Sequence, residues 1–349
     1  LIPENEMKWD SLEPQQGVFD FTVADSMVAY AEAHQMQVFG QMLVWGYTPQ
    51  LPAWLTQGNF TRDQLMDILH NYITTVVGHY SGKVEAWDVV NEAIADDPPP
   101  GTPQANPYWP LKDTFWSEGI GPDYVEMAFR WAREADPNVL LYYNDYNGEA
   151  AGGWQQAKSD RIYNLVEGLK QDGVPVDGVG LQMHTSIAWP PAPQDVAANI
   201  ERLAALGLEV RITEMDVRIQ DLTGPLSDRL NAQAKIFGDE ASVCMAEPAC
   251  KAFMTWGFTD KYSWIPWFTG HPDAALLFDE SYQPKPAYYA VLTALSGPIP
   301  VGGVAEPPLD SETPQSSGSG GRLPVAAVAL AGAVALGGVA WRVRRRSRT

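Results

Sequence analysis

Positively charged residues are scarce in this sequence. Its 349 residues include 23 Lys and Arg against 43 Asp and Glu, a formal net charge of -20. This balance argues against nucleic acid as a partner, because phosphates require a basic groove, and it suits a neutral substrate better. The length allows one barrel-sized domain or two ordinary domains.

Cysteine and histidine are scarce as well. Cys244 and Cys250 are the only cysteines, and the chain has five histidines. A metal site would need more ligands close together, so we expect no metal and no cofactor. A disulfide formed in an oxidising compartment is one interpretation of the two cysteines, and two unpaired thiols are the other.

Tryptophan, in contrast, is abundant, with 13 residues. Such side chains either fill a core or offer flat faces on which sugar rings stack. The second interpretation is stronger for a Trp that ends a strand.

The composition changes abruptly after Gly297. Residues 298–322 are mostly Pro, Gly, Ser, Asp and Glu, which is typical of a flexible linker. Residues 323–341 are uncharged, and the tail 342–349 is rich in Arg and has no acid. We expect a single transmembrane helix with the basic tail inside, which places the rest of the chain at the extracellular face of the cell membrane. The alternatives are a buried core helix and a cell-wall sorting signal that lacks its usual Thr-Gly.

Short apolar runs alternate with amphipathic stretches before this boundary. The runs predict strands at 37–45, 84–90, 139–143, 176–182, 208–213 and 252–256. The stretches predict helices at 22–34, 61–80, 122–135, 159–171, 195–206, 226–243 and 285–295. Thr61 and Gln64 have the spacing of a capping box. The alternation predicts a parallel sheet covered on both faces, in an α/β barrel or an open doubly wound sheet.

Polar residues gather where the predicted strands end. These groups are Asn91-Glu92, Asn144-Asp145, Gln182-Met183-His184 and Glu214-Met215-Asp216. All parallel strands of a barrel end on the same face, so these residues would converge there. Because no Gly-rich phosphate loop follows any strand, the pattern favours a barrel over a nucleotide-binding open sheet.

Glu92 and Glu214 are the candidate catalytic residues. Hydrolysis of a glycosidic bond needs one carboxyl group as acid and a second as nucleophile or stabiliser, and retention requires the two to lie ~5 to 5.5 Å apart. We expect burial near a negative charge to keep Glu92 protonated, and donors such as Gln182 and His184 to keep Glu214 ionised. Asp216 would orient His184. The alternative is that each Glu only caps the helix after it.

Six motifs of the chain resemble the family 10 endo-β-1,4-xylanases. They are Glu4-Asn5-Glu6-Met7-Lys8-Trp9, Trp87-Asp88-Val89-Val90-Asn91-Glu92, Tyr143-Asn144-Asp145-Tyr146-Asn147, Gly178-Val179-Gly180-Leu181-Gln182-Met183-His184, Ile212-Thr213-Glu214-Met215-Asp216 and Thr255-Trp256-Gly257 to Asp260-Lys261-Tyr262-Ser263-Trp264. The resemblance runs from the first residues to about Ser296, so the catalytic domain is expected at 1–297. It implies a (β/α)8 TIM barrel with Glu92 as acid/base, Glu214 as nucleophile and net retention.

The resemblance also implies the substrate-binding residues. Glu4, Asn5 and Lys8 would bind sugar hydroxyls on the glycone side, Asn91 would contact the 2-hydroxyl of the sugar being cleaved, and Trp256 and Trp264 would wall that sugar. The remaining expected contacts are Gln41, Trp45, Gln50, Asn144, Tyr146, Gln182 and His184. The spacing of Cys244 and Cys250 matches a disulfide common in these enzymes.

The chain departs from the family pattern at several places. Gln41 and Gly46 stand where the family usually has histidines, and Gln41 can donate a hydrogen bond to a sugar hydroxyl but cannot carry charge. The family's first strand and helix should precede Leu1, together with a signal peptide, so we expect a barrel that is incomplete at its N-terminal end. The Pro-rich segment 96–112 is either a surface excursion or a loop that shapes the aglycone subsites through Tyr108 or Trp109.

The predicted function is endo-acting, retaining hydrolysis of xylan or a related β-1,4-linked polysaccharide by a monomer. A β-glucanase of the same fold is the nearest alternative. A surface xylan-binding protein that has lost catalysis is a second one, although both candidate glutamates are present.

Overall fold

The computed structural model describes residues 1–96 and 110–296. The predicted linker at 298–322, transmembrane helix at 323–341, basic tail at 342–349 and the side chains of Tyr108 and Trp109 lie outside the described residues. Within 1–96 and 110–296, no helix combines the length and the apolar character that crossing a bilayer requires. The linker, the anchor and the tail stay predictions.

Strands and helices alternate along the described chain. The strands are β1 (Phe39–Gly40), β2 (Val44–Trp45), β3 (Ala86–Asn91), β4 (Leu140–Asp145), β5 (Gly178–Leu181), β6 (His184–Ser186), β7 (Glu209–Arg218) and β8 (Cys250–Thr255). The α-helices are α1 (Trp9–Leu12), α2 (Thr22–Ala33), α3 (Ala53–Thr56), α4 (Arg62–His79), α5 (Phe115–Gly119), α6 (Tyr124–Ala135), α7 (Gln156–Gln171), α8 (Pro193–Ala205), α9 (Leu226–Ala246), α10 (Ile265–Thr269) and α11 (Pro286–Leu295). The 3-10 turns are η1 (Thr48–Gln50), η2 (Gly153–Gln155) and η3 (Asp260–Tyr262).

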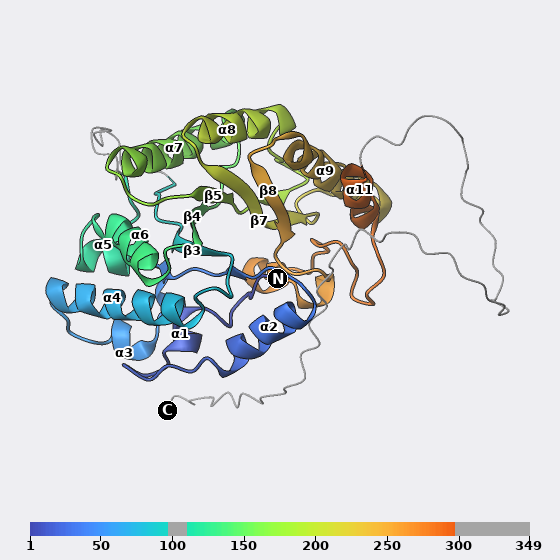
Figure 1. The fold of residues 1–349 in the computed structure, drawn as a ribbon. Coiled ribbons are helices and arrows are strands. Elements are labelled where there is room, and N and C mark those ends of the chain that lie inside the picture. The colour runs from blue at the N-terminus through green and yellow to red at the C-terminus, as the bar shows by residue number, and fades with distance from the viewer. Residues whose placement is uncertain (97–109, 297–349) are drawn as a thin grey trace, which may run out of the picture. The chain divides into compact units, whose positions relative to one another are not determined.

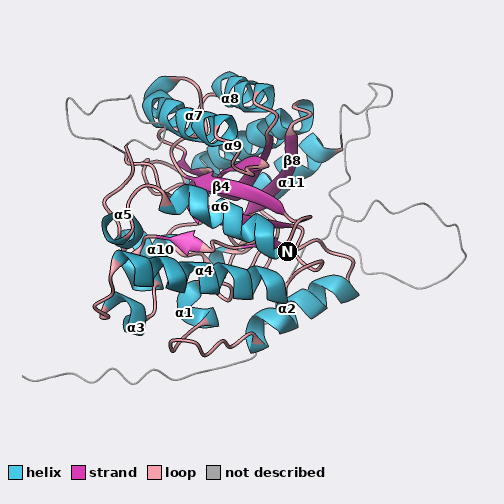
Figure 2. Cartoon of the chain, turned by 60° about the vertical axis from the view of Figure 1, so that its left-hand side comes forward, coloured by secondary structure: helices cyan, strands magenta, loops and turns pink. Residues whose placement is uncertain are grey.

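All strand pairs of the sheet are parallel. The order is β1-β3-β4-β5-β7-β6, with β2 also on β3 and β8 also on β7. Helices α4 and α6 cover one part of the outside of this sheet and α7, α8 and α9 cover another (Figure 1), an arrangement also visible after rotation (Figure 2). This is the order of the predicted (β/α)8 barrel, seen in the described residues as a partial barrel in which β8 pairs with β7 alone.

The first residue of the chain lies along the other edge of the sheet. The amino group of Leu1 donates to the Gln37 carbonyl oxygen at 2.6 Å, and the Phe39 N–H donates to the Leu1 carbonyl oxygen at 2.9 Å. Leu1 therefore pairs beside β1 in the manner of a neighbouring strand. The expected strand and helix before Leu1 stay a prediction.

The predicted helices and strands match the observed ones in type and order, except that the strand predicted at 37–45 is observed as two short strands, β1 and β2. The capping box at α4 is confirmed, since the Gln64 N–H donates to the Thr61 hydroxyl at 3.3 Å and the Thr61 N–H donates to the Gln64 side chain at 2.9 Å. A cap of this kind stabilises a helix by about 1 kcal/mol. The sequence analysis missed the short helices α1, α3, α5 and α10 and the strand β6.

An aromatic stack anchors the first motif of the chain. Trp9 lies flat on Tyr72 of α4, with ring centroids 3.6 Å apart, and 5.1 Å from Trp116 of α5. The indole N–H of Trp9 donates to Glu13 at 2.9 Å. Trp9 and Trp116 are therefore core residues rather than sugar platforms, and α1 holds the preceding residues 4–8 at the mouth of the barrel.

The two cysteines form a disulfide, as predicted. Cys244 lies in the last turn of α9 and Cys250 is the first residue of β8, with their Cα atoms 5.1 Å apart. The bond ties the end of the helix to the start of the next strand.

Glu240 of α9 is an acid buried inside the fold. It is 1% exposed, and its Oε2 atom has no hydrogen-bond partner among the described residues. Burial, reinforced by the nearby Asp239 and Glu149, raises the pKa of Glu240 to about 8. The folded chain therefore favours the neutral form of this side chain.

We expect Glu240 to make the free energy of unfolding depend on pH. A pKa raised in the folded state adds stability that is complete below the unfolded value of 4.5 and is lost as pH rises through about 8. Glu240→Gln keeps the side chain neutral at every pH. Between about pH 5 and about pH 9, the free energy of unfolding from urea denaturation should therefore decline less steeply with pH in this variant than in the parent chain, by up to ~1.4 kcal/mol per pH unit. Glu201→Gln, an exposed change on α8, is the control; equal slopes for Glu240→Gln and the parent chain would contradict the expectation.

Candidate active site

Polar side chains from neighbouring strands meet at the carboxyl end of the sheet. Asn91 of β3 is in register with Asn144 of β4, and Asn144 is in register with Gly180 of β5. His184 of β6 is in register with Asp216 of β7. The predicted convergence of the strand-end residues is confirmed.

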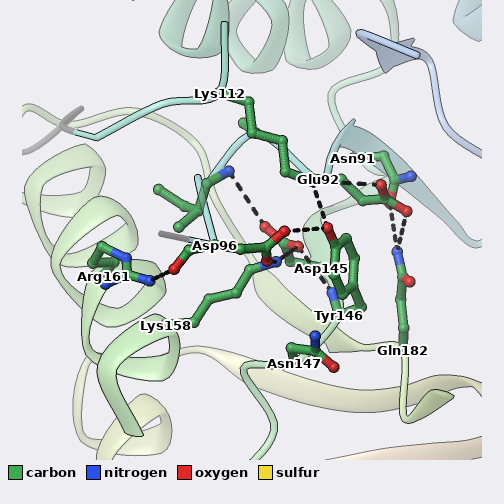
Figure 3. Close-up of polar contacts among 12 residues, drawn as sticks. Asn91, Glu92, Asp96, Lys112, Asp145, Tyr146, Asn147, Lys158, Arg161 and Gln182 are labelled. Carbon is green, nitrogen blue, oxygen red and sulfur yellow. Dashed lines mark hydrogen bonds and ion pairs between the residues drawn. The ribbon is translucent and has the colours of Figure 1, made fainter. Parts of the chain in front are cut away.

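Three amide side chains connect Glu92 to Glu214. Asn144 Nδ2 donates to Glu214 Oε1 at 2.7 Å and to Asn91 Oδ1 at 3.1 Å. Gln182 Nε2 donates to the same Asn91 oxygen at 3.1 Å and to Glu92 Oε1 at 3.1 Å, as Figure 3 shows. Both carboxylates therefore face one site, although 122 positions separate them in the sequence (214 minus 92).

The expected donors to Glu214 need one correction. Gln182 was expected to donate to Glu214, but its amide donates to Glu92 and Asn91 instead. Asn144 takes that place, and its side chain reaches Glu214 because Gly180 lies beneath it. A Cβ atom on Gly180 would lie 2.2 Å from Asn144 Oδ1, so any larger residue there would displace the amide.

His184 lies between two carboxylates, as predicted. Its Nε2 atom is 3.3 Å from Glu214 Oε2 and its Nδ1 atom is 2.8 Å from Asp216 Oδ2. Trp264 Nε1 donates to the same Asp216 oxygen at 2.8 Å. Burial alone would lower the pKa of His184, but the charges of Asp216 and Glu214 outweigh it and hold that pKa well above its usual range. The two carboxylates therefore favour the cationic form of the imidazole, which pairs with Glu214 as well as with Asp216.

Glu92 follows the last residue of β3 in a left-handed backbone conformation, with φ 55°. That conformation is costly for a residue with a side chain and tends to occur at functional sites. Burial raises the pKa of Glu92; the charge of Lys112 opposes this effect, and the charge of Asp145 adds to it. The direction of this shift agrees with the expectation that burial favours the protonated form of Glu92.

The first motif forms a second polar cluster beside the carboxylates. Lys8 Nζ donates to Asn5 Oδ1 at 2.9 Å and lies 5.6 Å from the ring centroid of Trp45 and 5.8 Å from that of Trp256. Burial lowers the pKa of Lys8, and Glu214 opposes that effect. Burial, reinforced by the charge of Glu6, raises the pKa of Glu4 to about 6. Gln50, at the end of η1, shares a small cavity with Lys8 and Trp45.

Gln41 and Gly46 are placed differently from the expectation. Gln41 is fully buried, and neither polar atom of its side chain has a hydrogen-bond partner among the described residues. It lies under the site near the equally buried Asp88, so its expected contact with a sugar hydroxyl is not supported. At Gly46, a Cβ atom would lie 2.4 Å from Thr114 Cβ, which leaves no room there for a histidine.

Tyr146 is embedded in a network of charges. Its hydroxyl donates to Asp96 Oδ2 at 2.6 Å and accepts from Lys112 Nζ at 3.1 Å. Lys158 Nζ lies 3.4 Å from the centroid of the Tyr146 ring and bonds Asp96 at 2.7 Å and Asp145 at 2.9 Å (Figure 3). The sequence analysis missed these partners, since Lys112 and Lys158 lie outside the six motifs.

The chain is similar to known proteins over its described part. The model of glycosyl hydrolase family 10 matches residues 1–294. Endo-1,4-beta-xylanase B of Thermotoga neapolitana is 42% identical over 291 residues, which cover 83% of this chain and 79% of that protein. Beta-1,4-xylanase of Dictyoglomus thermophilum is 38% identical over 302 residues, which cover 84% and 80%.

Solved structures agree with these relatives. Native xylanase 10B from Thermotoga maritima superposes with a TM-score of 0.77 at 44% identity, covering 85% of this chain and 86% of that one. Xylanase 10B from Thermotoga petrophila RKU-1, solved in complex with xylobiose, gives a TM-score of 0.77 at 44% identity and covers 85% of each chain.

We expect Asp216→Asn to lower the pKa of His184 towards its ordinary value, because the change removes the charge that raises it most. An NMR titration of the histidine side chains measures this directly, and His184→Gln assigns the resonance among the five histidines. Asp25→Asn is the matched control, since Asp25 pairs with the distant His79 at 2.8 Å. A His184 titration that is the same in Asp216→Asn and the parent chain would refute the assigned cause.

Proposed function

Because the chain belongs to glycosyl hydrolase family 10, we propose that it is an endo-1,4-β-xylanase that cleaves xylan with retention of configuration, Glu92 being the acid/base and Glu214 the nucleophile. The observation that carries this proposal is the pair of carboxylates joined through Asn91, Asn144 and Gln182 at the mouth of the barrel. The similarity to named xylanases, one of them solved with xylobiose, supports the choice of substrate.

In the first step, Glu214 attacks the anomeric carbon while Glu92 gives its proton to the departing glycosidic oxygen. The bond between the sugar and the leaving chain breaks, and an ester between the sugar and Glu214 forms. The hydrogen bond from Asn144 and the pairing with His184 hold Glu214 in position until it attacks. Because its pKa is raised, Glu92 more readily holds the proton that it gives to the leaving oxygen.

In the second step, Glu92 takes a proton from water, whose oxygen attacks the same carbon and releases Glu214. Two inversions at one carbon leave the β configuration unchanged. The same carboxyl thus acts first as an acid and then as a base.

The remaining side chains have proposed roles in binding the polysaccharide. Asn91 would contact the 2-hydroxyl of the sugar being cleaved, between the walls formed by Trp256 and Trp264. Further along the chain of sugars, the glycone contacts would be Glu4, Asn5, Lys8, Trp45 and Gln50, and Tyr146 would lie on the other side of the cleavage point.

A β-glucanase is the second candidate, because Gln41 and Gly46 replace the histidines usual in the family. Gln41 is fully buried and Gly46 lies close against Thr114, so neither position offers an imidazole to a sugar. An activity screen on xylan, mixed-linkage glucan and cellulose separates the two candidates. Binding of xylan without release of reducing sugar would favour a non-catalytic binding protein.

We expect Glu214→Ala to abolish hydrolysis of every substrate, because no nucleophile remains. Glu92→Ala should lower kcat on xylan by roughly 10²- to 10⁴-fold, the usual contribution of a general acid. With an aryl β-xylobioside whose leaving group needs no protonation, Glu92→Ala should still form the glycosyl-enzyme, and added azide should then yield a β-xylobiosyl azide. Proton NMR of the first product from the parent enzyme should show the β anomer. An initial α anomer, or substantial activity in Glu214→Ala, would rule out the proposed mechanism.

A further inference from the structure

We propose that Lys112 is a further positioning residue of this enzyme: its ammonium group, fixed by Tyr146, stabilises the negative charge that develops on Glu92 as its proton passes to the leaving group. The inference rests on the proposed role of Glu92. Lys112 belongs to none of the six motifs, and it is the last residue of the Pro-rich segment 96–112.

The geometry places the cation beside the carboxyl without blocking it. Lys112 Nζ lies 3.7 Å from Glu92 Oε2, which is beyond hydrogen-bond distance. The two side chains are 23% and 19% exposed, so water screens the pair only in part. Glu92 Oε2 is therefore free to hold the proton that the leaving oxygen takes, while the positive charge stays close. Figure 3 shows Lys112 extended towards Glu92 and Tyr146.

Tyr146 fixes the position of the ammonium group. Its hydroxyl hydrogen is committed to Asp96 at 2.6 Å, so the oxygen presents lone pairs to Lys112 Nζ at 3.1 Å. Lys112 Nζ also lies 4.5 Å from the centroid of the Tyr146 ring. Asp96 is held in turn by Lys158 at 2.7 Å. The cation is thus prearranged before any substrate binds, which is the condition for strong electrostatic stabilisation.

The backbone of Lys112 is held on the strand-end segment that follows Glu92. The Lys112 N–H donates to the Ala93 carbonyl oxygen at 2.8 Å, and Leu111 pairs with Ile94 in an antiparallel bridge. The Ser117 hydroxyl donates to the Lys112 carbonyl oxygen at 2.7 Å. Lys112 and Glu92 are therefore attached to the same short piece of structure, and their separation does not depend on distant parts of the chain.

The charges around Glu92 give Lys112 a specific task. Burial, Asp145 and Glu214 favour the neutral carboxyl, whereas Lys112 and Gln182 favour the ion. Among the described groups that shift the pKa of Glu92, Lys112 is the only cation. The neighbouring Lys158 pairs with Asp96 and Asp145 instead. An acid that must lose its proton in the first step and act as a base in the second needs such a counter-charge.

The test is the pH dependence of kcat/KM on xylohexaose for Lys112→Met and Lys112→Gln. The high-pH limb reports the protonation of Glu92, so both variants should shift it upward by about one pH unit, the lower end of the effect of an opposite charge at this distance. kcat should fall on xylohexaose and stay close to the parent value on the activated aryl β-xylobioside. Lys112→Arg should restore the parent profile, and Tyr146→Phe should give an intermediate shift.

Lys235→Met is the matched control. Lys235 is an exposed lysine of α9 that pairs with Asp239 and is not part of the candidate active site. Thermal melting confirms that each variant is folded. If Lys112→Met does not fold, Lys112→Gln provides the test. An unmoved high-pH limb in a folded Lys112→Met or Lys112→Gln variant would overturn the inference. Glu92→Gln distinguishes failure of this inference from failure of the proposed function. If the high-pH limb persists in Glu92→Gln, Glu92 is not the acid and the proposed function itself fails.

Discussion

One side-chain oxygen connects the two halves of the active site. Asn91 Oδ1 accepts from Asn144 and from Gln182, which bond Glu214 and Glu92 respectively. Because Asn91 Oδ1 is buried and accepts from both amides, displacing either strand end would break one of these hydrogen bonds, at a cost of ~0.5–1.5 kcal/mol. The separation of the two carboxylates is therefore set by the parallel register of β3, β4, β5 and β7, and every chemical role proposed above depends on it.

The two carboxylates then acquire different surroundings from their neighbours. Glu214 accepts a hydrogen bond from Asn144 on one oxygen and pairs with His184 on the other. Glu92 meets one amide and one cation beyond hydrogen-bond distance, at the end of a strand that buries it. Two identical side chains can thus serve opposite purposes in one reaction, because the difference lies in the groups that surround them.

The fold could be predicted from the sequence because its strands are continuous apolar runs and its helices are amphipathic. β6 was not predicted because His184-Thr185-Ser186 is polar and shows no hydropathy pattern. Its pairing with β7 nevertheless brings His184 to Asp216. The identities of the site residues were predicted from motifs, but their partners could not be. The direction of the Gln182 amide depends on Glu92 and Asn91, two strands away, and no local pattern contains that information. Lys112 was not identified for a related reason, since its position is fixed by the Tyr146 hydroxyl, 34 positions away.

The replacement of a family histidine by Gln41 acquires a physical meaning once Asp88 is considered with it. Asp88 is fully buried in β3, and both of its carboxyl oxygens lack hydrogen-bond partners among the described residues. Burial, reinforced by the charge of Glu214, holds the pKa of Asp88 well above its usual range, and Arg211 only partly opposes that effect. A histidine at position 41 could take the proton and leave an ion pair in the core, whereas Gln41 cannot. Burial and the charge of Glu214 therefore favour the neutral form of Asp88, and Gln41 offers no group that could take its proton.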